Sequence, residues 1–152
     1  MILSRGRRYI FIHIPKTGGT ALTRALEARA MKDDILVGDT PKARRRKGRL
    51  KGVETEGRLW KHSTLADLRG LATDAEIASL FTVTLVRNPW DRMVSYYHWL
   101  REQSFAHPAV ALARHSGFSA FLDAPDTRAT IAAHPYGRYV TTAAGAERCD
   151  LF

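Results

Sequence analysis

The sequence predicts an α/β fold in which a central parallel sheet is flanked by helices. Residues 9–14, Tyr-Ile-Phe-Ile-His-Ile, form a nearly continuous apolar run rich in β-branched and aromatic side chains, which is typical of a strand buried on both faces. Residues 81–86, Phe-Thr-Val-Thr-Leu-Val, are a second such run, and a helical pattern follows each of them. Strands that alternate with helices indicate a parallel sheet. Because ligands of such sheets bind at the carboxyl ends of the strands, the residues after each run are candidates for a functional site.

The first predicted strand leads through a glycine turn into a helix. Gly18 and Gly19 follow the strand, and apolar side chains then recur at helical spacing. The apolar stripe consists of Ala21, Leu22, Ala25, Leu26 and Ala28 to Ala30. Arg24, Glu27 and Lys32 fall on the wetter side of this helix.

The stretch after this helix has no sustained periodicity from residue 33 to residue 57. Within it, residues 42–51 hold seven basic residues in ten. Runs of like charge repel one another and stay solvated, so we expect a mobile basic loop at 38–57.

Weaker patterns fill the space before the second strand. Residues 58–62, Arg-Leu-Trp-Lys-His, are expected to form a short strand. A helix capped by Ser63 or Thr64 is expected to run through Leu71, and Asp67 has the spacing to complete a capping box from Thr64. Another helical turn or two is expected over 74–80.

The second strand is followed by a helical region. Pro89 suits the first turn of a helix that continues to about Arg101. Residues 105–134 read as short helices, whose apolar anchors are Phe118, Phe121 and Leu122. No repeat or linker divides the chain, so we expect a single domain over 1–152.

Composition limits the partners and the compartment. The formal net charge of +9 favours anionic partners such as nucleotides, acidic glycans, nucleic acid or acidic lipid. Cys149 is the only cysteine, so an internal disulfide is impossible and an oxidising compartment is not implied. The longest N-terminal apolar run, 9–14, is too short for a signal segment or a membrane span. We therefore expect a soluble, cytoplasmic protein.

The turn between the first strand and its helix has the chemistry of an anion site. Gly18 and Gly19 allow a close approach of the backbone, and the first N–H groups of the helix point toward such an anion. Lys16 adds a positive charge, and Thr17 and Thr20 add hydroxyl donors. The lysine precedes the glycines, so the Walker spacing is absent and an ordinary ATPase or GTPase is disfavoured. A plain connecting turn with an exposed lysine is the alternative.

Two segments resemble a known family. Residues 11–20, Phe-Ile-His-Ile-Pro-Lys-Thr-Gly-Gly-Thr, resemble the 5′-phosphosulfate loop of sulfotransferases that use 3′-phosphoadenosine 5′-phosphosulfate (PAPS). Residues 86–97, which begin Val-Arg-Asn-Pro-Trp-Asp, look like the family's 3′-phosphate motif, an Arg followed eight residues later by a Ser. The branch that contains carbohydrate sulfotransferases and small bacterial relatives is the most similar.

This resemblance implies a three-layer P-loop-like fold and a cofactor site for PAPS, whose product is PAP. The 5′ end of the nucleotide would be bound by Pro15, Lys16, Thr17, Gly18, Gly19, Thr20 and Ala21. Arg87 and Ser95 would bind the 3′-phosphate, for which a guanidinium at a strand end is well suited. The reaction would transfer a sulfuryl group to an acceptor hydroxyl, with a carbohydrate as the family-based acceptor. Lys16 would stabilise the leaving oxygen.

The acceptor hydroxyl needs a general base, and His62 is the candidate. A histidine titrates close to the working pH, and relatives that act on sugars often carry one between the two phosphate motifs. Glu54 or Glu56 could take this role instead. His13 is expected to be packed inside the first strand, and His98 to lie on the outer face of its helix. No metal cluster is visible.

Other readings stay open. The basic run 42–51 could steer an anionic acceptor, bind nucleic acid without sequence preference, or simply be solvated; it has no interleaved aromatic residues, which weighs against a dedicated nucleic-acid module. A degenerate module that binds PAPS or PAP without turnover and a P-loop nucleotide kinase-like enzyme are the rival functions. Residues 145–152 read as the approach to another strand. Because relatives usually continue further, we expect a truncated member or a fragment, with activity in doubt.

Overall fold

The computed structural model describes all residues from Met1 to Phe152. The chain divides into two compact units, each described here by itself. Unit 1 comprises 1–86 and 136–152, and unit 2 comprises 87–135. Compact units within a chain need not be separate domains, so the expectation of a single domain stays a prediction.

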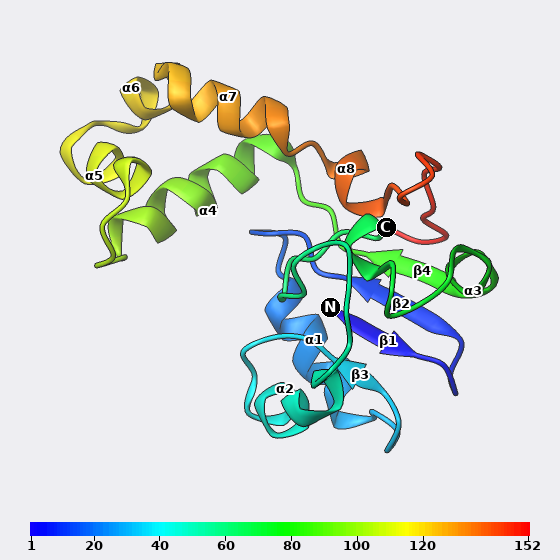
Figure 1. Cartoon of the computed structure of the whole chain (residues 1–152). Helices are drawn as coiled ribbons and strands as arrows, with labels where there is room; N and C mark the ends of the chain where they lie inside the picture. Colours follow the sequence, from blue (N-terminus) through cyan, green and yellow to red (C-terminus); the bar gives the residue numbers. More distant parts are fainter. The chain divides into compact units, whose positions relative to one another are not determined.

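Unit 1 contains a mixed four-stranded sheet in the order β3-β1-β2-β4 (Figure 1). Its strands are β1 (Ile2–Ser4), β2 (Tyr9–Ile12), β3 (Ile35–Leu36) and β4 (Phe81–Thr84). The central strand β2 runs parallel to β4, with Ile12 paired to Thr84 at the carboxyl end. The predicted α/β class is confirmed, and the strands predicted over 9–14 and 81–86 are present as β2 and β4.

The prediction of a parallel sheet throughout is wrong, because β1 runs antiparallel to both β2 and β3. Only residues 5–8 connect β1 to β2, and so short a connection permits antiparallel pairing alone. A strand of three residues leaves little periodicity to detect, so β1 was missed in the sequence. The three-layer P-loop-like architecture stays a prediction.

The end of the chain lies beside β4. The backbone N–H of Asp150 donates to the carbonyl of Thr82 at 2.8 Å, and that of Thr84 donates to the carbonyl of Leu151 at 3.0 Å. Leu151 forms a parallel bridge with Val83. The expectation that 145–152 approaches another strand is confirmed at this edge of the sheet.

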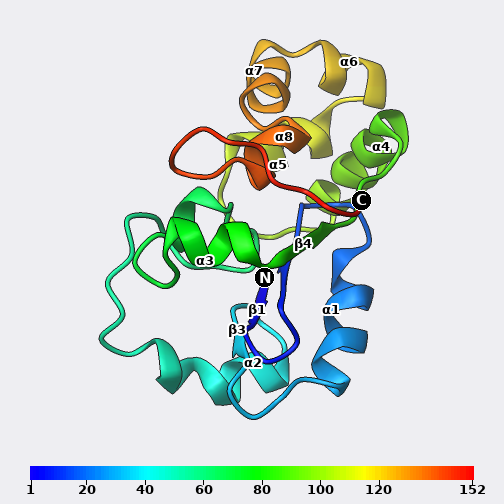
Figure 2. The same ribbon diagram turned by 90° about the vertical axis from the view of Figure 1, so that its right-hand side faces the viewer.

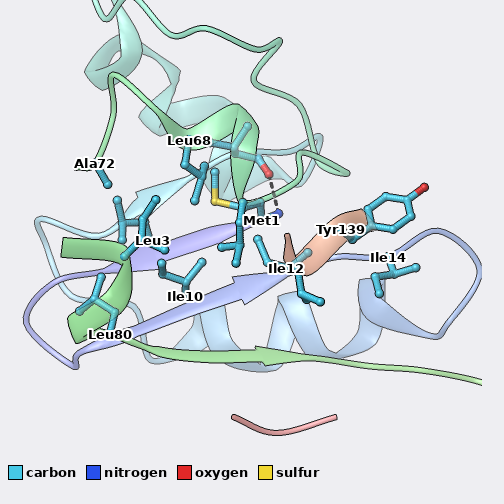
Figure 3. Close-up of a cluster of buried hydrophobic side chains, with 13 residues drawn as sticks. Met1, Leu3, Ile10, Ile12, Ile14, Leu68, Ala72, Leu80 and Tyr139 are labelled. Atoms are coloured by element: carbon cyan, nitrogen blue, oxygen red, sulfur yellow. Dashed lines mark hydrogen bonds between the residues drawn. The ribbon is translucent and has the colours of Figure 1, made fainter. Parts of the chain in front are cut away.

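Different elements cover the two faces of the sheet. On one face, side chains of β1 and β2 pack with Leu68, Ile77 and Tyr139 (Figure 3). On the other, Phe11 packs with Leu26 of α1 and with other apolar side chains. Figure 2 shows the sheet from its edge, with α1 and α3 on opposite sides. The helices of unit 1 are α1 (Gly19–Ala28), α2 (Pro41–Arg46), α3 (Asp74–Ser79) and α8 (Tyr136–Val140).

The segment before α3 departs from the prediction. Residues 58–62 form no strand, because the Ser63 hydroxyl accepts from the N–H of Trp60 and lies within hydrogen-bonding distance of the carbonyls of Arg58 and Trp60, which closes a turn. The helix expected over 64–71 shrinks to a 3-10 turn, Ala66–Leu68. Its capping box is present, since Thr64 and Asp67 bond reciprocally through their side chains and backbone N–H groups.

Within the loop expected at 38–57, residues 41–50 are helical, whereas residues 51–57 form no helix or strand; the expected mobility stays a prediction. The helical segment forms α2 and a 3-10 helix, Lys47–Leu50. Three of its cations bind backbone carbonyls of unit 1. Lys42 donates to Glu27, Arg46 donates to Met31 and Asp34, and Arg49 donates to Asp34. These bonds connect the segment to the end of α1 and to the turn after it. Part of the positive charge of the basic run therefore stabilises the fold.

Unit 2 is helical, as predicted for 105–134. Its helices pack around Tyr97, Leu100, Val110 and Phe121, and the Tyr97 hydroxyl donates to the carbonyl of Ser116 at 2.8 Å. The helices are α4 (Pro89–Arg101), α5 (Pro108–His115), α6 (Phe118–Asp123) and α7 (Pro125–Ala133). None of the chain's helices combines the length and the apolarity that crossing a bilayer requires.

Thr40 joins α2 to α1, which gives a stability test. Its hydroxyl accepts from the N–H of Ala43 as the N-cap of α2 and donates to the buried carboxylate of Glu27 at 2.7 Å. We expect Thr40→Ala to lower the free energy of unfolding in urea by about 2–3 kcal/mol, because a cap and a buried charge lose a partner together.

The matched control is Thr73→Ala. Thr73 caps α3 by accepting from Glu76 N–H, in an exposed position. Its loss should cost only about 1 kcal/mol. Equal losses for the two variants would show that the bond to Glu27 contributes nothing.

Candidate functional site

The loop between β2 and α1 has an unusual backbone. Lys16 lies at φ 66° and Gly18 at φ 87°, both in the left-handed region, while Thr17 between them does not. Such alternation turns successive N–H groups toward one side and forms a concavity that suits an anion. A non-glycine residue in this region costs about 1 kcal/mol or more, and such strain is concentrated at functional sites.

The first turn of α1 presents N–H groups without a side-chain cap. Gly18 is the N-cap residue and has no side chain to accept from them. The N-terminus of a helix carries the positive end of its dipole, so it favours a negative ligand at this point. The predicted anion loop and the helix N-terminus therefore coincide.

The two threonines of the loop differ in their roles. The Thr17 side chain is buried, and its hydroxyl donates to the carbonyl of Ile14 at 2.9 Å. A hydroxyl has one proton, so in this conformation that hydroxyl braces the loop and cannot also donate to an anion. Thr20 is exposed on α1. The binding roles of residues 15–21 stay predictions.

His13 was expected to be packed, and its side chain packs directly against the start of α1. It is buried, and a Cβ placed on Gly19 would lie 2.1 Å from its Cδ2 atom and 2.5 Å from its Nε2 atom. Only glycine fits at residue 19 without displacing the ring. This contact sets the position of the helix N-terminus on the strand that precedes it.

His62, the predicted base, lies next to this junction. Its Nδ1 atom is 2.7 Å from the carbonyl oxygen of His13, and the two imidazole rings meet edge to face with centroids 4.6 Å apart. A carbonyl can only accept, so Nδ1 carries the proton and Nε2 is left as the acceptor nitrogen. The Trp60 ring packs against His62 at 4.9 Å. The structure thus places His62 beside His13, two residues before Pro15, where the predicted cofactor loop begins.

Both imidazoles are neutral at neutral pH. Burial lowers the pKa of His62 to about 4, although the bond to the His13 carbonyl acts in the opposite direction. Burial, together with the charge of His62, lowers the pKa of His13 to about 3. A neutral His62 with its Nδ1 proton fixed is in the form that can accept a proton at Nε2.

The other candidate side chains in unit 1 are carboxylates. Glu54 and Glu56 are both exposed, and Glu56 Oε1 lies 3.4 Å from Arg69 Nη1. Neither is held by a buried partner in the way that His62 is. No group of three or more His, Cys, Asp or Glu side chains is arranged to hold a metal ion.

Arg87 and Ser95 belong to unit 2. Arg87 is exposed and precedes α4, whose N-cap Asn88 accepts from Trp90 N–H at 3.0 Å. Ser95 is half-buried on the same helix, and His98 is exposed as predicted. Arg87 directly follows Val86, the last residue of this part of unit 1, and comes three residues after the end of β4. The roles of Arg87 and Ser95 toward a phosphate stay predictions.

A cavity of about 460 Å³ opens at the carboxyl ends of β2 and β4. Ile14, Thr84 and Val86 line it together with Cys149 and Phe152 from the end of the chain. This edge of the sheet is where ligands of α/β folds bind.

The model of the sulfotransferase family matches residues 1–141. The chain belongs to the sulfotransferase family. The match spans both the 15–20 loop and the Arg87–Ser95 segment, so the resemblance seen in the sequence is confirmed. No curated protein and no solved structure matches the chain.

Sequence reasoning missed three features of this sulfotransferase-family site. They are the packing of His13 on Gly19, the bond from His62 to the His13 carbonyl, and the left-handed conformation of Lys16. The only signal in the sequence was a histidine inside an apolar strand just before the glycines. A histidine in that place indicates packing, but it does not name its partner.

The contact between Gly19 and His13 can be tested by Gly19→Ala. The added methyl group must displace the buried ring, so we expect a loss of about 1–3 kcal/mol in the free energy of unfolding, measured in urea. Gly48→Ala, where a Cβ would meet nothing within 4 Å, should cost far less. Adding His13→Ala to Gly19→Ala should recover part of the loss. Additive effects of the two changes would contradict the contact.

The paired histidines predict an acid-sensitive fold. Both pKa values lie below the ordinary value of 6.5, so the unfolded chain binds more protons as the pH falls below it. The stability contributed by the neutral rings is complete above pH 6.5 and falls as the pH drops, down to about pH 4 for His62 and about pH 3 for His13. His62→Asn keeps a donor for the His13 carbonyl but does not titrate.

The melting temperature, followed from pH 7.5 to pH 4.5, should therefore fall less steeply for His62→Asn than for the parent chain. His98→Asn, at an exposed position on α4, should leave the slope unchanged. Parallel curves for all three proteins would show that His62 does not titrate across folding.

Proposed function

We propose that the chain transfers a sulfuryl group from PAPS to an acceptor hydroxyl, with a carbohydrate as the acceptor. The observation that carries the proposal is the strained loop at Lys16 and Gly18, which joins an uncapped helix N-terminus and adjoins a fixed, neutral histidine. Membership of the sulfotransferase family supports the class of reaction.

The loop binds the 5′-phosphosulfate through its N–H groups. During an in-line displacement, negative charge builds on the oxygen that bridges sulfur to the nucleotide phosphate. Backbone donors stabilise this charge in the transition state because they are already oriented before the reaction begins, and the Lys16 ammonium adds a positive charge. The strain at Lys16 is consistent with a backbone held for this purpose.

His62 activates the acceptor. Its Nδ1–H donates to the His13 carbonyl, so Nε2 takes the proton of the acceptor hydroxyl as the oxygen attacks sulfur. Burial lowers the pKa of His62 to about 4, so this base is unprotonated at neutral pH. The same shift makes it a weaker base than an ordinary imidazole, contrary to the expectation that it titrates close to the working pH. Arg87 and Ser95 bind the 3′-phosphate, and the planar guanidinium suits two parallel hydrogen bonds to it.

Calorimetry with PAP and with ATP tests the cofactor. PAP should bind, and ATP, which lacks a 3′-phosphate, should bind at least tenfold more weakly because charge-assisted bonds to that group are lost. Labelled PAPS with a panel of acceptors then tests transfer. Binding of PAP without any transfer would favour a binding module, and Mg²⁺-dependent ATP hydrolysis would favour a kinase-like enzyme.

Two substitutions separate the roles in the reaction. Lys16→Met should reduce turnover by at least a hundredfold with an unchanged fold, as the loss of one donor to the developing charge does elsewhere. His62→Asn should lower kcat by about 10²–10⁴ while the Kd for PAP stays the same, because the base touches the acceptor and not the nucleotide.

Lys32→Met removes one exposed lysine beyond the end of α1 and serves as the control for charge. Its turnover should equal that of the parent chain. Turnover of Lys16→Met close to the parent value would refute the role of Lys16, and a raised Kd for PAP in His62→Asn would place that residue in nucleotide binding instead.

A further inference from the structure

A second cavity is lined by none of the residues that the proposed reaction uses. It has a volume of about 350 Å³, within the range of small-molecule sites, and it is formed by β3, α2 and the turn at 59–61. Its apolar wall includes Leu36, Leu50 and Leu59. Trp60 forms a further part of the wall and is 44% exposed.

The charge of this cavity is predominantly positive. Four charged residues line it, three of them cationic: Asp39, Arg44, Lys47 and Lys61. Asp39 is paired with Lys61 at 2.7 Å, and this bond, with Arg44 nearby, lowers the pKa of Asp39. The single carboxylate is therefore neutralised by Lys61. Arg44 and Lys47 appear in none of the chain's salt bridges.

The cations that line the cavity differ in their contacts from other cations of the basic run. Lys42, Arg46 and Arg49 are committed to backbone carbonyls, whereas Arg44 and Lys47 line the cavity. An apolar wall with an exposed indole beside two cations has the chemistry of a site for a ring that carries an anionic group.

The cavity is also next to the base. The Trp60 ring contacts both: it lines the cavity, and it packs against the His62 ring at 4.9 Å. The Arg58 guanidinium lies over the indole at 5.8 Å, so neighbours on two sides hold Trp60 in place. A molecule seated on Trp60 is therefore one side chain away from the group that would accept its proton.

We propose that this cavity is the acceptor subsite, and that it takes an acidic sugar whose ring packs on Trp60 and whose carboxylate or sulfate binds Arg44 and Lys47. The identification of this cavity as an acceptor subsite rests on the proposed function. The binding itself is independent of the nucleotide, so the two can fail separately.

The test is a titration of the ¹⁵N-labelled protein, without nucleotide, with trigalacturonate, its methyl ester and glucose 6-sulfate. Trp60→Phe identifies the indole signal of Trp60, and Trp90 and Trp99 of unit 2 serve as internal references. The Trp60 signal should move with the carboxylate or the sulfate probe, and which of them acts identifies the anion. The uncharged ester should bind at least tenfold more weakly.

The double variant Arg44→Gln/Lys47→Gln should raise the Kd for the active probe about tenfold or more. Arg45→Gln/Lys51→Gln removes the same charge from exposed residues of the same run that do not line the cavity, and its Kd should stay within about twofold. An unmoved Trp60 signal with both acidic probes, or equal weakening in the two double variants, would overturn the subsite.

Calorimetry with PAP keeps the two proposals apart. Sugar binding with these properties but no PAP binding would remove the proposed reaction and leave an acidic-sugar site. PAP binding with sulfuryl transfer, together with an unmoved Trp60, would place the acceptor elsewhere.

Discussion

The packing of His13 on Gly19 is the contact on which the site of unit 1 depends. The imidazole fills the space that a Cβ at residue 19 would need, so the first turn of α1 rests directly against the end of the strand region. The carbonyl of the same histidine binds Nδ1 of His62. One residue thus places the helix N-terminus with its side chain and orients the neighbouring imidazole with its backbone. The loop from Pro15 to Gly18 connects the end of the strand region to the first turn of α1, and Lys16 and Gly18 adopt left-handed conformations within it.

The positive charge of the chain has two uses within unit 1. Cations of α2 and the following 3-10 helix donate to carbonyls at the end of α1 and in the turn at Asp34, and so hold these segments together. Two other cations of the same run, Arg44 and Lys47, line the cavity beside Trp60. The basic run looks uniform in the sequence, but in the structure some of its residues bind backbone carbonyls and others line the cavity. The net charge alone could not have revealed this division.

Much of the fold could be predicted because its signals are local. The apolar runs of β2 and β4, the glycine turn, the capping box at Thr64 and the helices of unit 2 each leave a pattern within a few residues. The missed features depend on contacts between distant residues. Strand β1 owes its existence to pairing with β2 and β3, the segment 41–50 is ordered by carbonyls of residues 27–34, and the expected strand at 58–62 gives way to bonds from Ser63. The loop and His62 were found from the sequence, but the carbonyl that orients His62 could not be.

The central claim is that the N–H groups at Gly18 and Gly19 bind the 5′ end of a nucleotide. The most direct measurement is a ¹H–¹⁵N titration with PAP and with adenosine 5′-phosphosulfate, which lacks the 3′-phosphate. Both ligands should shift the Gly18 and Gly19 amide signals downfield, and only PAP should also move the Nε–H signal of Arg87. Saturable binding of PAP that leaves the Gly18 and Gly19 amides unmoved would contradict the account.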